Sequence, residues 1–158
     1  MRHPFWISLP FAIIASAVVL FFVYREDAAP LTGESLKDAR ARWAAAGPPD
    51  YDLTIVVSGV QEGEHEIEVR NGAVTAMRTG GAAVPRSVWR HWDVPGMFRF
   101  LATELENARE PERAHGTNAS VVLRADFDEQ YGYPRRFLRH VTGQRRSIEW
   151  KVRAFAKK

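Results

Sequence analysis

The sequence contains no cysteine. The protein therefore cannot form a disulfide, a thiolate nucleophile, a cysteine-based zinc site or the acylated cysteine of a lipoprotein. A phosphate-binding loop, a dinucleotide-binding fingerprint and a nucleophile elbow are also missing. With 158 residues, the chain has room for one ordinary domain and excludes large enzymes and polytopic carriers.

A long hydrophobic run is present at the N-terminus. Phe5 to Tyr24 are twenty residues without a formal charge, and as a helix they would span ~30 Å, the hydrocarbon thickness of a bilayer. The run ends in bulky residues, Phe21 to Tyr24, where a signal peptidase needs small ones. We therefore expect residues 1–25 to form an uncleaved transmembrane signal-anchor, followed by a linker over residues 26–34.

This segment also predicts a location. An N-terminal membrane helix with a long folded domain behind it usually leaves its short end in the cytoplasm. We expect a single-pass inner (cytoplasmic) membrane protein with its N-terminus in the cytoplasm. The C-terminal domain would then lie outside, in the periplasm or the extracellular space.

Residues 35–156 are expected to form one globular α+β domain. Ser35 to Asp38 have the form of a capping box at the start of a first helix, and Asp93 is the expected N-cap of a second. Each helix precedes three segments of strand-like alternation, and Asn71-Gly72 marks a hairpin between two of these segments. The expected fold is a mainly antiparallel sheet of about six strands with two helices on one face, in the order helix, three strands, helix, three strands. The expected strands lie in residues 51–59, 64–70, 74–78, 121–127, 137–141 and 148–154.

Five short motifs follow one another along the chain: Ala41–Trp43, Asp50–Asp52, Val69–Val74, Val94–Phe98 and Tyr131–Pro134. Their order resembles a family of small exported bacterial proteins, many of them lipoproteins, known as domain of unknown function 6174. The resemblance implies a location in the cell envelope and no established activity, and it offers no catalytic residues. Two features depart from the family pattern: a membrane helix replaces the lipidated cysteine, and Phe127-Asp128 stands where the family has Tyr-Asp.

Aromatic and arginine side chains gather in two segments, one before the second helix and one at a turn. This combination suits anionic or aromatic ligands, through stacking and bidentate hydrogen bonds. The alternative is that the aromatic rings fill the core while the arginines extend to solvent. The candidate ligand-binding residues are Trp89, Arg90, Trp92, Tyr131, Tyr133, Arg135 and Arg136.

Positive charge is concentrated at the C-terminal end. Residues 131–158 contain nine lysines and arginines and a single acid, Glu149. Next to a membrane anchor, such a segment can contact anionic headgroups, and the candidate membrane-surface residues are Arg145, Arg146, Lys151 and Arg153. Pairing of these charges with the acidic strand residues Glu64, Glu66 and Glu68 is the structural alternative.

The function expected from these observations is a non-catalytic binding module for an envelope protein, a peptide or an anionic lipid. Neither a cofactor nor a metal is expected, and nucleic acid is an unlikely partner for an exported domain. The alternative is a small hydrolase or transferase in which His91 or His140 works with Asp126 or Asp128. His65 lies among glutamates, but on a strand it points to the opposite face, so these residues do not converge on a metal.

Overall fold

The computed structural model describes residues 28–59, 62–142 and 147–158. The expected signal-anchor over residues 1–25 lies outside these ranges. Within them, none of the helices combines the length and the apolar character needed to cross a bilayer.

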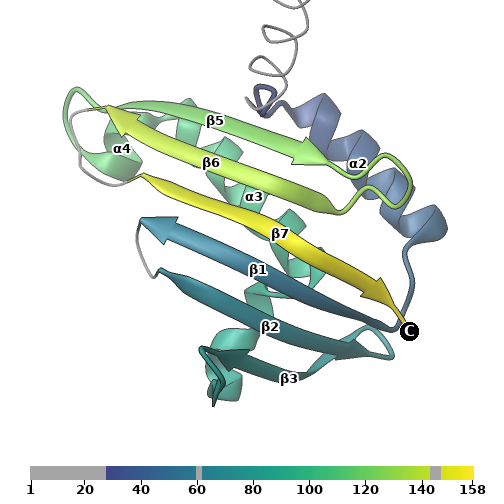
Figure 1. The fold of residues 1–158 in the computed structure, drawn as a ribbon. Helices are drawn as coiled ribbons and strands as arrows, with labels where there is room; N and C mark the ends of the chain where they lie inside the picture. The colour runs from purple at the N-terminus through teal and green to yellow at the C-terminus, as the bar shows by residue number, and fades with distance from the viewer. Residues whose placement is uncertain (1–27, 60–61, 143–146) are drawn as a thin grey trace, which may run out of the picture.

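The domain is built on one antiparallel sheet of seven strands (Figure 1). The strand order is β4-β3-β2-β1-β7-β6-β5, so two consecutive meanders meet where the first strand pairs with the last. That central pairing runs from Tyr51 opposite Lys157 to Gly59 opposite Ile148. The strands are β1 (Tyr51–Gly59), β2 (Gly63–Arg70), β3 (Ala73–Thr79), β4 (Ala82–Ala83), β5 (Ser120–Phe127), β6 (Pro134–Thr142) and β7 (Ile148–Lys157).

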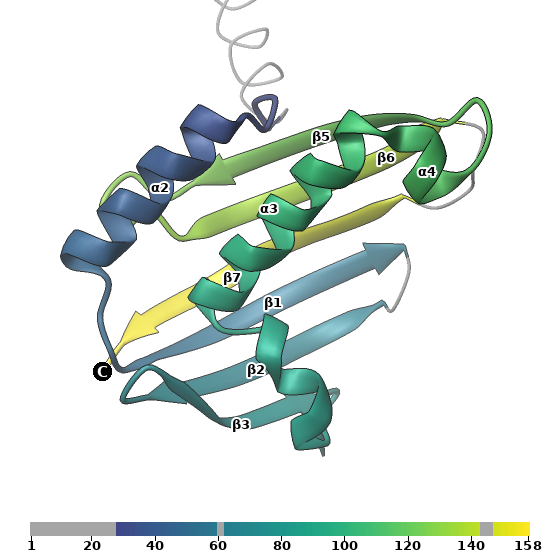
Figure 2. The same ribbon diagram turned by 180° about the vertical axis from the view of Figure 1, so that it is seen from behind.

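Two long helices, α2 (Gly33–Ala46) and α3 (Val94–Arg109), cover the same face of the sheet (Figure 2). The 3-10 helix η1 (Arg86–His91) precedes α3, and the short helix α4 (Pro111–His115) follows it. These elements confirm the expected α+β class and the antiparallel sheet. The sheet has seven strands, where about six were expected, because the two residues of β4 extend its edge.

Three local features differ from the sequence-based expectations. The first helix is capped by Thr32, not by Ser35. The backbone N–H of Ser35 donates to the Thr32 hydroxyl, and the backbone N–H of Thr32 donates to the Ser35 hydroxyl. Residues 109–117 are mostly polar and their sequence predicts a loop, but they contain α4, which begins at Pro111, a favoured first residue of a helix. Residues 28–31, placed in a linker, run beside β5, where the Leu31 N–H donates to the carbonyl of Leu123.

The hydrophobic core lies between the sheet and the two long helices. Strand alternation and helical spacing in the sequence predict ten side chains that share a core. Eight of them are buried in one cluster, and the other two, Trp43 and Leu105, pack against it partly exposed. Alternation along β1 accounts for this arrangement, because every second residue from Tyr51 to Val57 points toward the helices. The eight buried residues are Leu53, Ile55, Ile67, Val69, Phe98, Leu101, Leu123 and Trp150.

Candidate functional site

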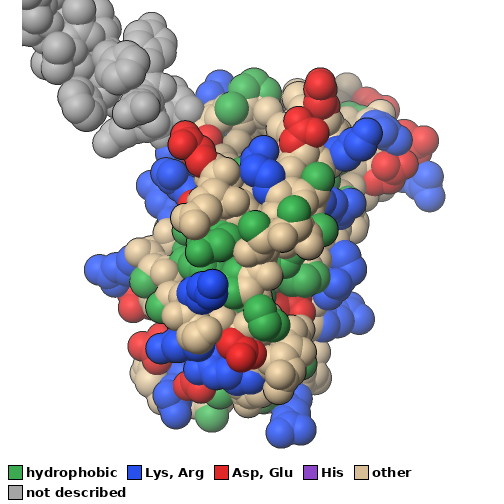
Figure 3. Space-filling view, turned by 90° about the vertical axis from the view of Figure 1, so that its right-hand side faces the viewer, with side chains coloured by type: hydrophobic (Ala, Val, Ile, Leu, Met, Phe, Trp, Pro, Cys, Tyr) green, Lys and Arg blue, Asp and Glu red, His purple; other side chains and the backbone are tan. Residues whose placement is uncertain are grey.

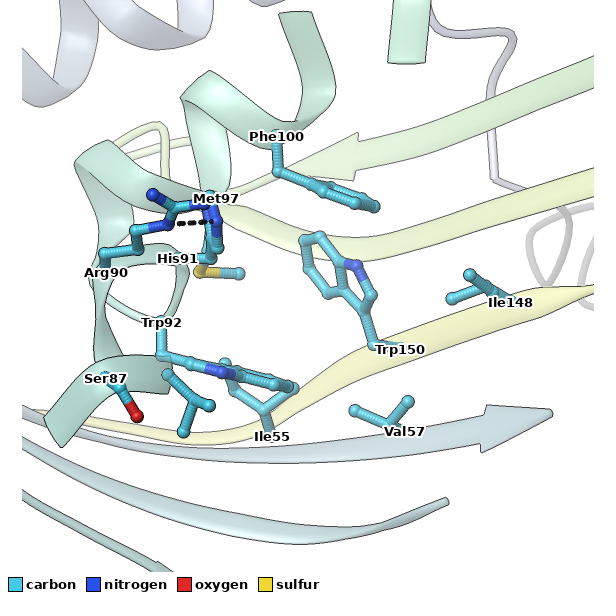
Figure 4. Close-up of a pocket in the computed structure, with 11 residues that line it drawn as sticks. Ile55, Val57, Ser87, Arg90, His91, Trp92, Met97, Phe100, Ile148 and Trp150 are labelled. Atoms are coloured by element: carbon cyan, nitrogen blue, oxygen red, sulfur yellow. Dashed lines mark hydrogen bonds between the residues drawn. The ribbon is translucent and has the colours of Figure 1, made fainter. Parts of the chain in front are cut away.

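A pocket of about 400 Å³ opens between the sheet and the helical segment formed by η1 and α3 (Figure 4). Strands β1 and β7 form its floor, α3 contributes Met97 and Phe100, and η1 forms one side of its mouth. The pocket exists because the first and last strands pair at the centre of the sheet, which brings their inward side chains together. Its lining residues are Ile55, Val57, Ser87, Val88, Arg90, His91, Trp92, Met97, Phe100, Ile148 and Trp150.

The interior of the pocket is apolar. Ile55, Val57, Met97 and Trp150 are buried, and Phe100 and Ile148 are half-buried. A cavity of this size with an apolar wall and a few polar groups at its mouth has the usual properties of a small-molecule site.

The polar groups at the mouth come from η1 and the residue that follows it. Arg90 Nε donates to His91 Nε2 at 2.9 Å, as the dashed line in Figure 4 shows. Because His91 Nε2 is then the acceptor, a neutral His91 carries its proton on Nδ1. Among the described residues that line the pocket there is no aspartate or glutamate, and Arg90 is the charged side chain at its mouth.

His65 supports the wall of the pocket from behind. Its ring packs against that of Trp92, with centroids 4.4 Å apart, and its Nδ1 lies 2.7 Å from Thr79 Oγ1. Glu64, Glu66 and His65 follow the strand alternation, with the histidine buried and the acids pointing away from the core. In the described residues, no group of three or more acidic or histidine side chains is arranged to hold a metal ion.

Stability should depend on pH through His65. Burial lowers the pKa of His65 below its ordinary value, so the unfolded chain takes up a proton that the folded chain resists. The free energy of unfolding should therefore fall as the pH decreases through ~6.5, and the loss should level off below the folded-state pKa. Denaturant melts from pH 8 to pH 5 should show a weaker pH dependence for His65→Phe than for the wild type. Equal pH dependence in the wild type and in His65→Phe would contradict this.

The second half of the expected aromatic–arginine group lies elsewhere. Tyr131 and Tyr133 pack on Phe155, with ring centroids 5.7 and 4.4 Å away, and neither lines the pocket. Arg135 is exposed, and Arg136 Nε donates to Glu149 at 2.9 Å. The structure thus brings Arg90 and Trp92 together at the pocket and keeps the turn residues apart from them. Trp89 lies beside the pocket, with its indole N–H bonded to the carbonyl of Val84.

Tyr131, Tyr133 and Phe155 belong to an aromatic cluster that also includes Trp43 and Tyr51. The cluster joins the end of α2 to the last residues of β7. Figure 3 views the molecule from the end where α2 finishes and the C-terminus lies; hydrophobic side chains gather in the middle of that view and charged side chains surround them.

The candidate membrane-surface residues are divided between described and undescribed parts of the chain. Arg145 and Arg146 lie outside the described residues. Lys151 pairs with Glu149 at 3.3 Å, and Arg153 pairs with Glu64. The Arg153–Glu64 pair is of the kind that the structural alternative predicts, whereas Lys151 pairs with an acid of its own strand.

The four residues of the alternative catalytic hypothesis do not meet. His140 lies near Ser147 and faces Val122 across the strand pair, whereas Asp126 faces Arg136, four residues earlier on β6. At ~3.3 Å per residue, this separates His140 from Asp126 by ~13 Å along the strand. Asp128 caps the turn by accepting from the backbone of Gln130 and Tyr131, and His91 bonds to Arg90. No histidine–carboxylate pair is available for acid–base catalysis among these residues.

The motifs that carried the family resemblance contact one another and hold the fold together. The Asp50 carboxylate accepts from the backbone N–H of Asn71 at 2.6 Å. The Tyr51 hydroxyl accepts from the backbone N–H of Val94 at 3.0 Å, at the first turn of α3. Gly132, with φ +80°, packs so closely on α2 that a Cβ atom would lie 2.3 Å from the carbonyl oxygen of Ala39.

Tyr51→Phe should destabilise the protein. Tyr51 is 1% exposed, and burial raises the pKa of its hydroxyl far above the ordinary value. Removing the hydroxyl leaves the buried N–H of Val94 unsatisfied, which should lower the free energy of unfolding by ~1–3 kcal/mol. Urea melts followed by tryptophan fluorescence measure the loss. Tyr133→Phe, at a half-buried tyrosine, is the control and should lower the free energy of unfolding by less than ~0.5 kcal/mol. Equal losses in the two variants would show that the hydrogen bond of the Tyr51 hydroxyl makes no particular contribution to stability.

A model of a family of unknown function, DUF6174, covers residues 35–138. Neither the curated proteins nor the solved structures contain a significant match to this chain.

Proposed function

This chain belongs to the DUF6174 family of unknown function, and from that premise we propose that it is a membrane-anchored, non-catalytic domain of the cell envelope that binds a small apolar ligand in the pocket between η1 and β7. The observation that carries the proposal is the pocket itself: about 400 Å³, with an apolar interior and polar groups only at its mouth. The candidate catalytic histidines and carboxylates lie apart, which favours binding over catalysis.

Membrane anchoring is supported by the hydrophobic run from Phe5 to Tyr24 and by the short distance in sequence between this run and the folded domain. Ala28 is already buried, and its carbonyl accepts from Arg124 at 3.1 Å. A helix over residues 1–25 would therefore hold the domain close to the bilayer surface, with the N-terminus in the cytoplasm and the domain outside.

Fractionation tests the anchoring. The full chain should stay with the membrane after alkaline carbonate extraction, and protease added to intact spheroplasts should digest the domain. Release by carbonate would contradict the anchor, and protection from protease would reverse the orientation.

Photo-crosslinking tests the binding. The full-length protein in phosphatidylcholine nanodiscs would be irradiated with an uncharged alkyl diazirine, and the labelled residues located by mass spectrometry. We expect labels on the pocket-lining parts of β1, β7 and α3. Val57→Trp, which places an indole in the pocket, should remove these labels, whereas Val122→Trp, at an exposed position on the opposite face, should retain them. Labels spread evenly over the domain would contradict a ligand pocket.

A further inference from the structure

We infer that the ligand of this pocket is a single-chain fatty acid, held by its acyl chain in the apolar interior and by its carboxylate at Arg90. This inference rests on the proposed binding function and adds the chemical class of the ligand. Three observations carry it: the volume of the apolar space, the unshared donors at its mouth, and the absence of acidic groups from the described residues of its lining.

The apolar space suits a chain of limited length. Taking ~30 Å³, the volume of a water molecule in the liquid, as the size of a methylene group, a pocket of about 400 Å³ holds roughly a dozen such groups. The walls of this space are the aliphatic side chains of β1, Met97 and Phe100 of α3, and Trp150 of β7, without a charged group among them (Figure 4). A flexible saturated chain in such a space is stabilised by dispersion contacts with the walls and by the removal of its apolar surface from water.

The mouth offers donors in an arrangement that fits a carboxylate. Arg90 uses its Nε for His91, and in the described part of the chain its two terminal nitrogens have no hydrogen-bond or ion-pair partner. These two nitrogens form the planar fork that binds a carboxylate through parallel hydrogen bonds. The bond to His91 orients the guanidinium group.

Two indole groups add further donors. Trp92 and Trp150 both line the pocket, and neither indole N–H makes a hydrogen bond within the described ranges, in contrast to Trp89, which donates to Val84. The pocket therefore combines an apolar interior with hydrogen-bond donors, and the part of its lining that the structure describes contains no carboxylate. This charge pattern favours an anionic amphiphile over a neutral or cationic one.

The test compares two photoreactive probes on the full-length protein in phosphatidylcholine nanodiscs: dodecanoate with a diazirine near the end of its chain, and the matching dodecanol. At pH 8, dodecanoate should label the pocket residues more strongly than the alcohol. Arg90→Gln removes a charge-assisted hydrogen bond and should reduce labelling by dodecanoate about tenfold or more, with labelling by the alcohol unchanged. Arg86→Gln, on the same 3-10 helix but outside the pocket, should retain both labels.

The outcomes separate this inference from the proposed function. If both probes label the pocket equally in the wild type and in Arg90→Gln, the pocket binds apolar ligands but does not recognise a carboxylate, and the inference is overturned while the proposed function stands. Equal loss of both labels in Arg90→Gln also overturns it, because the arginine then shapes the pocket without selecting the acid. If neither probe labels the pocket in the wild type, both the inference and the proposed function fail.

Discussion

Glu104→Ala is expected to lower the free energy of unfolding by ~3–5 kcal/mol, because it leaves a buried arginine without its partner. Glu104 lies on α3 and its Oε1 accepts from Arg139 Nη1 of β6 at 2.7 Å. The two side chains are only 6% and 15% exposed, so solvent screens the remaining guanidinium charge poorly. Urea melts followed by tryptophan fluorescence measure the loss.

Another ion pair on the same helix provides a matched control. Glu106 pairs with Arg109 one turn later, with side chains 70% and 74% exposed, and Glu106→Ala should cost no more than ~0.5 kcal/mol. The double variant Glu104→Leu/Arg139→Met should recover most of the stability lost in Glu104→Ala, because an apolar pair of similar volume leaves no buried charge. Similar losses for Glu104→Ala and Glu106→Ala would show that burial does not govern this pair.

The buried pair illustrates a limit of the sequence. Periodicity predicted α3, and Asp93 was correctly identified as its N-cap, since the Asp93 side chain accepts from the Gly96 N–H at 2.6 Å. Glu104 lies three residues after the buried Leu101, on the covered side of the helix. A pattern of apolar residues does not reveal a buried acid. The free-energy cost of burying Glu104 is offset by Arg139, which lies on another element 35 residues later.

Most of the strands could also be predicted from a local pattern in the sequence. Alternation of apolar and polar residues identifies a half-buried strand and the face it turns to the core, and it located β1, β2, β3, β5, β6 and β7. It cannot identify the two-residue strand β4, which has no alternation to detect. It also could not place residues 28–31 beside β5, because their backbone hydrogen bonds carry no side-chain pattern.

The candidate site was only partly predictable. Arg90 and Trp92 were singled out because arginine and aromatic residues cluster before α3, and both line the pocket. The other wall is formed by Ile55 and Trp150, which are nearly a hundred residues apart in sequence. The alternation around each of them predicts only a buried core position. Recognising a pocket there requires the pairing of β1 with β7, which local alternation does not specify.

The quoted family motifs have a structural explanation that the sequence could not supply. Asp50 and Asn71 join the start of β1 to the β2–β3 turn, and Tyr51 caps α3. Gly132 allows the turn before β6 to contact α2. These residues position the helices over the sheet, and the pocket lies where that arrangement leaves space. The motifs therefore account for the fold, while most of the residues that line the pocket lie outside them.

Leu101→Ala is expected to lower the free energy of unfolding by ~2–5 kcal/mol, through lost burial and the cavity left behind. Leu101 is fully buried between α3 and the sheet. Leu138→Ala is the matched control, since Leu138 is half-buried on a strand of the same sheet and should lose less. The comparison is made in urea melts at a single pH. A loss below ~1 kcal/mol for Leu101→Ala would contradict tight packing of α3 on the sheet, and would also remove the support for a pocket whose walls include Met97 and Phe100 of that helix.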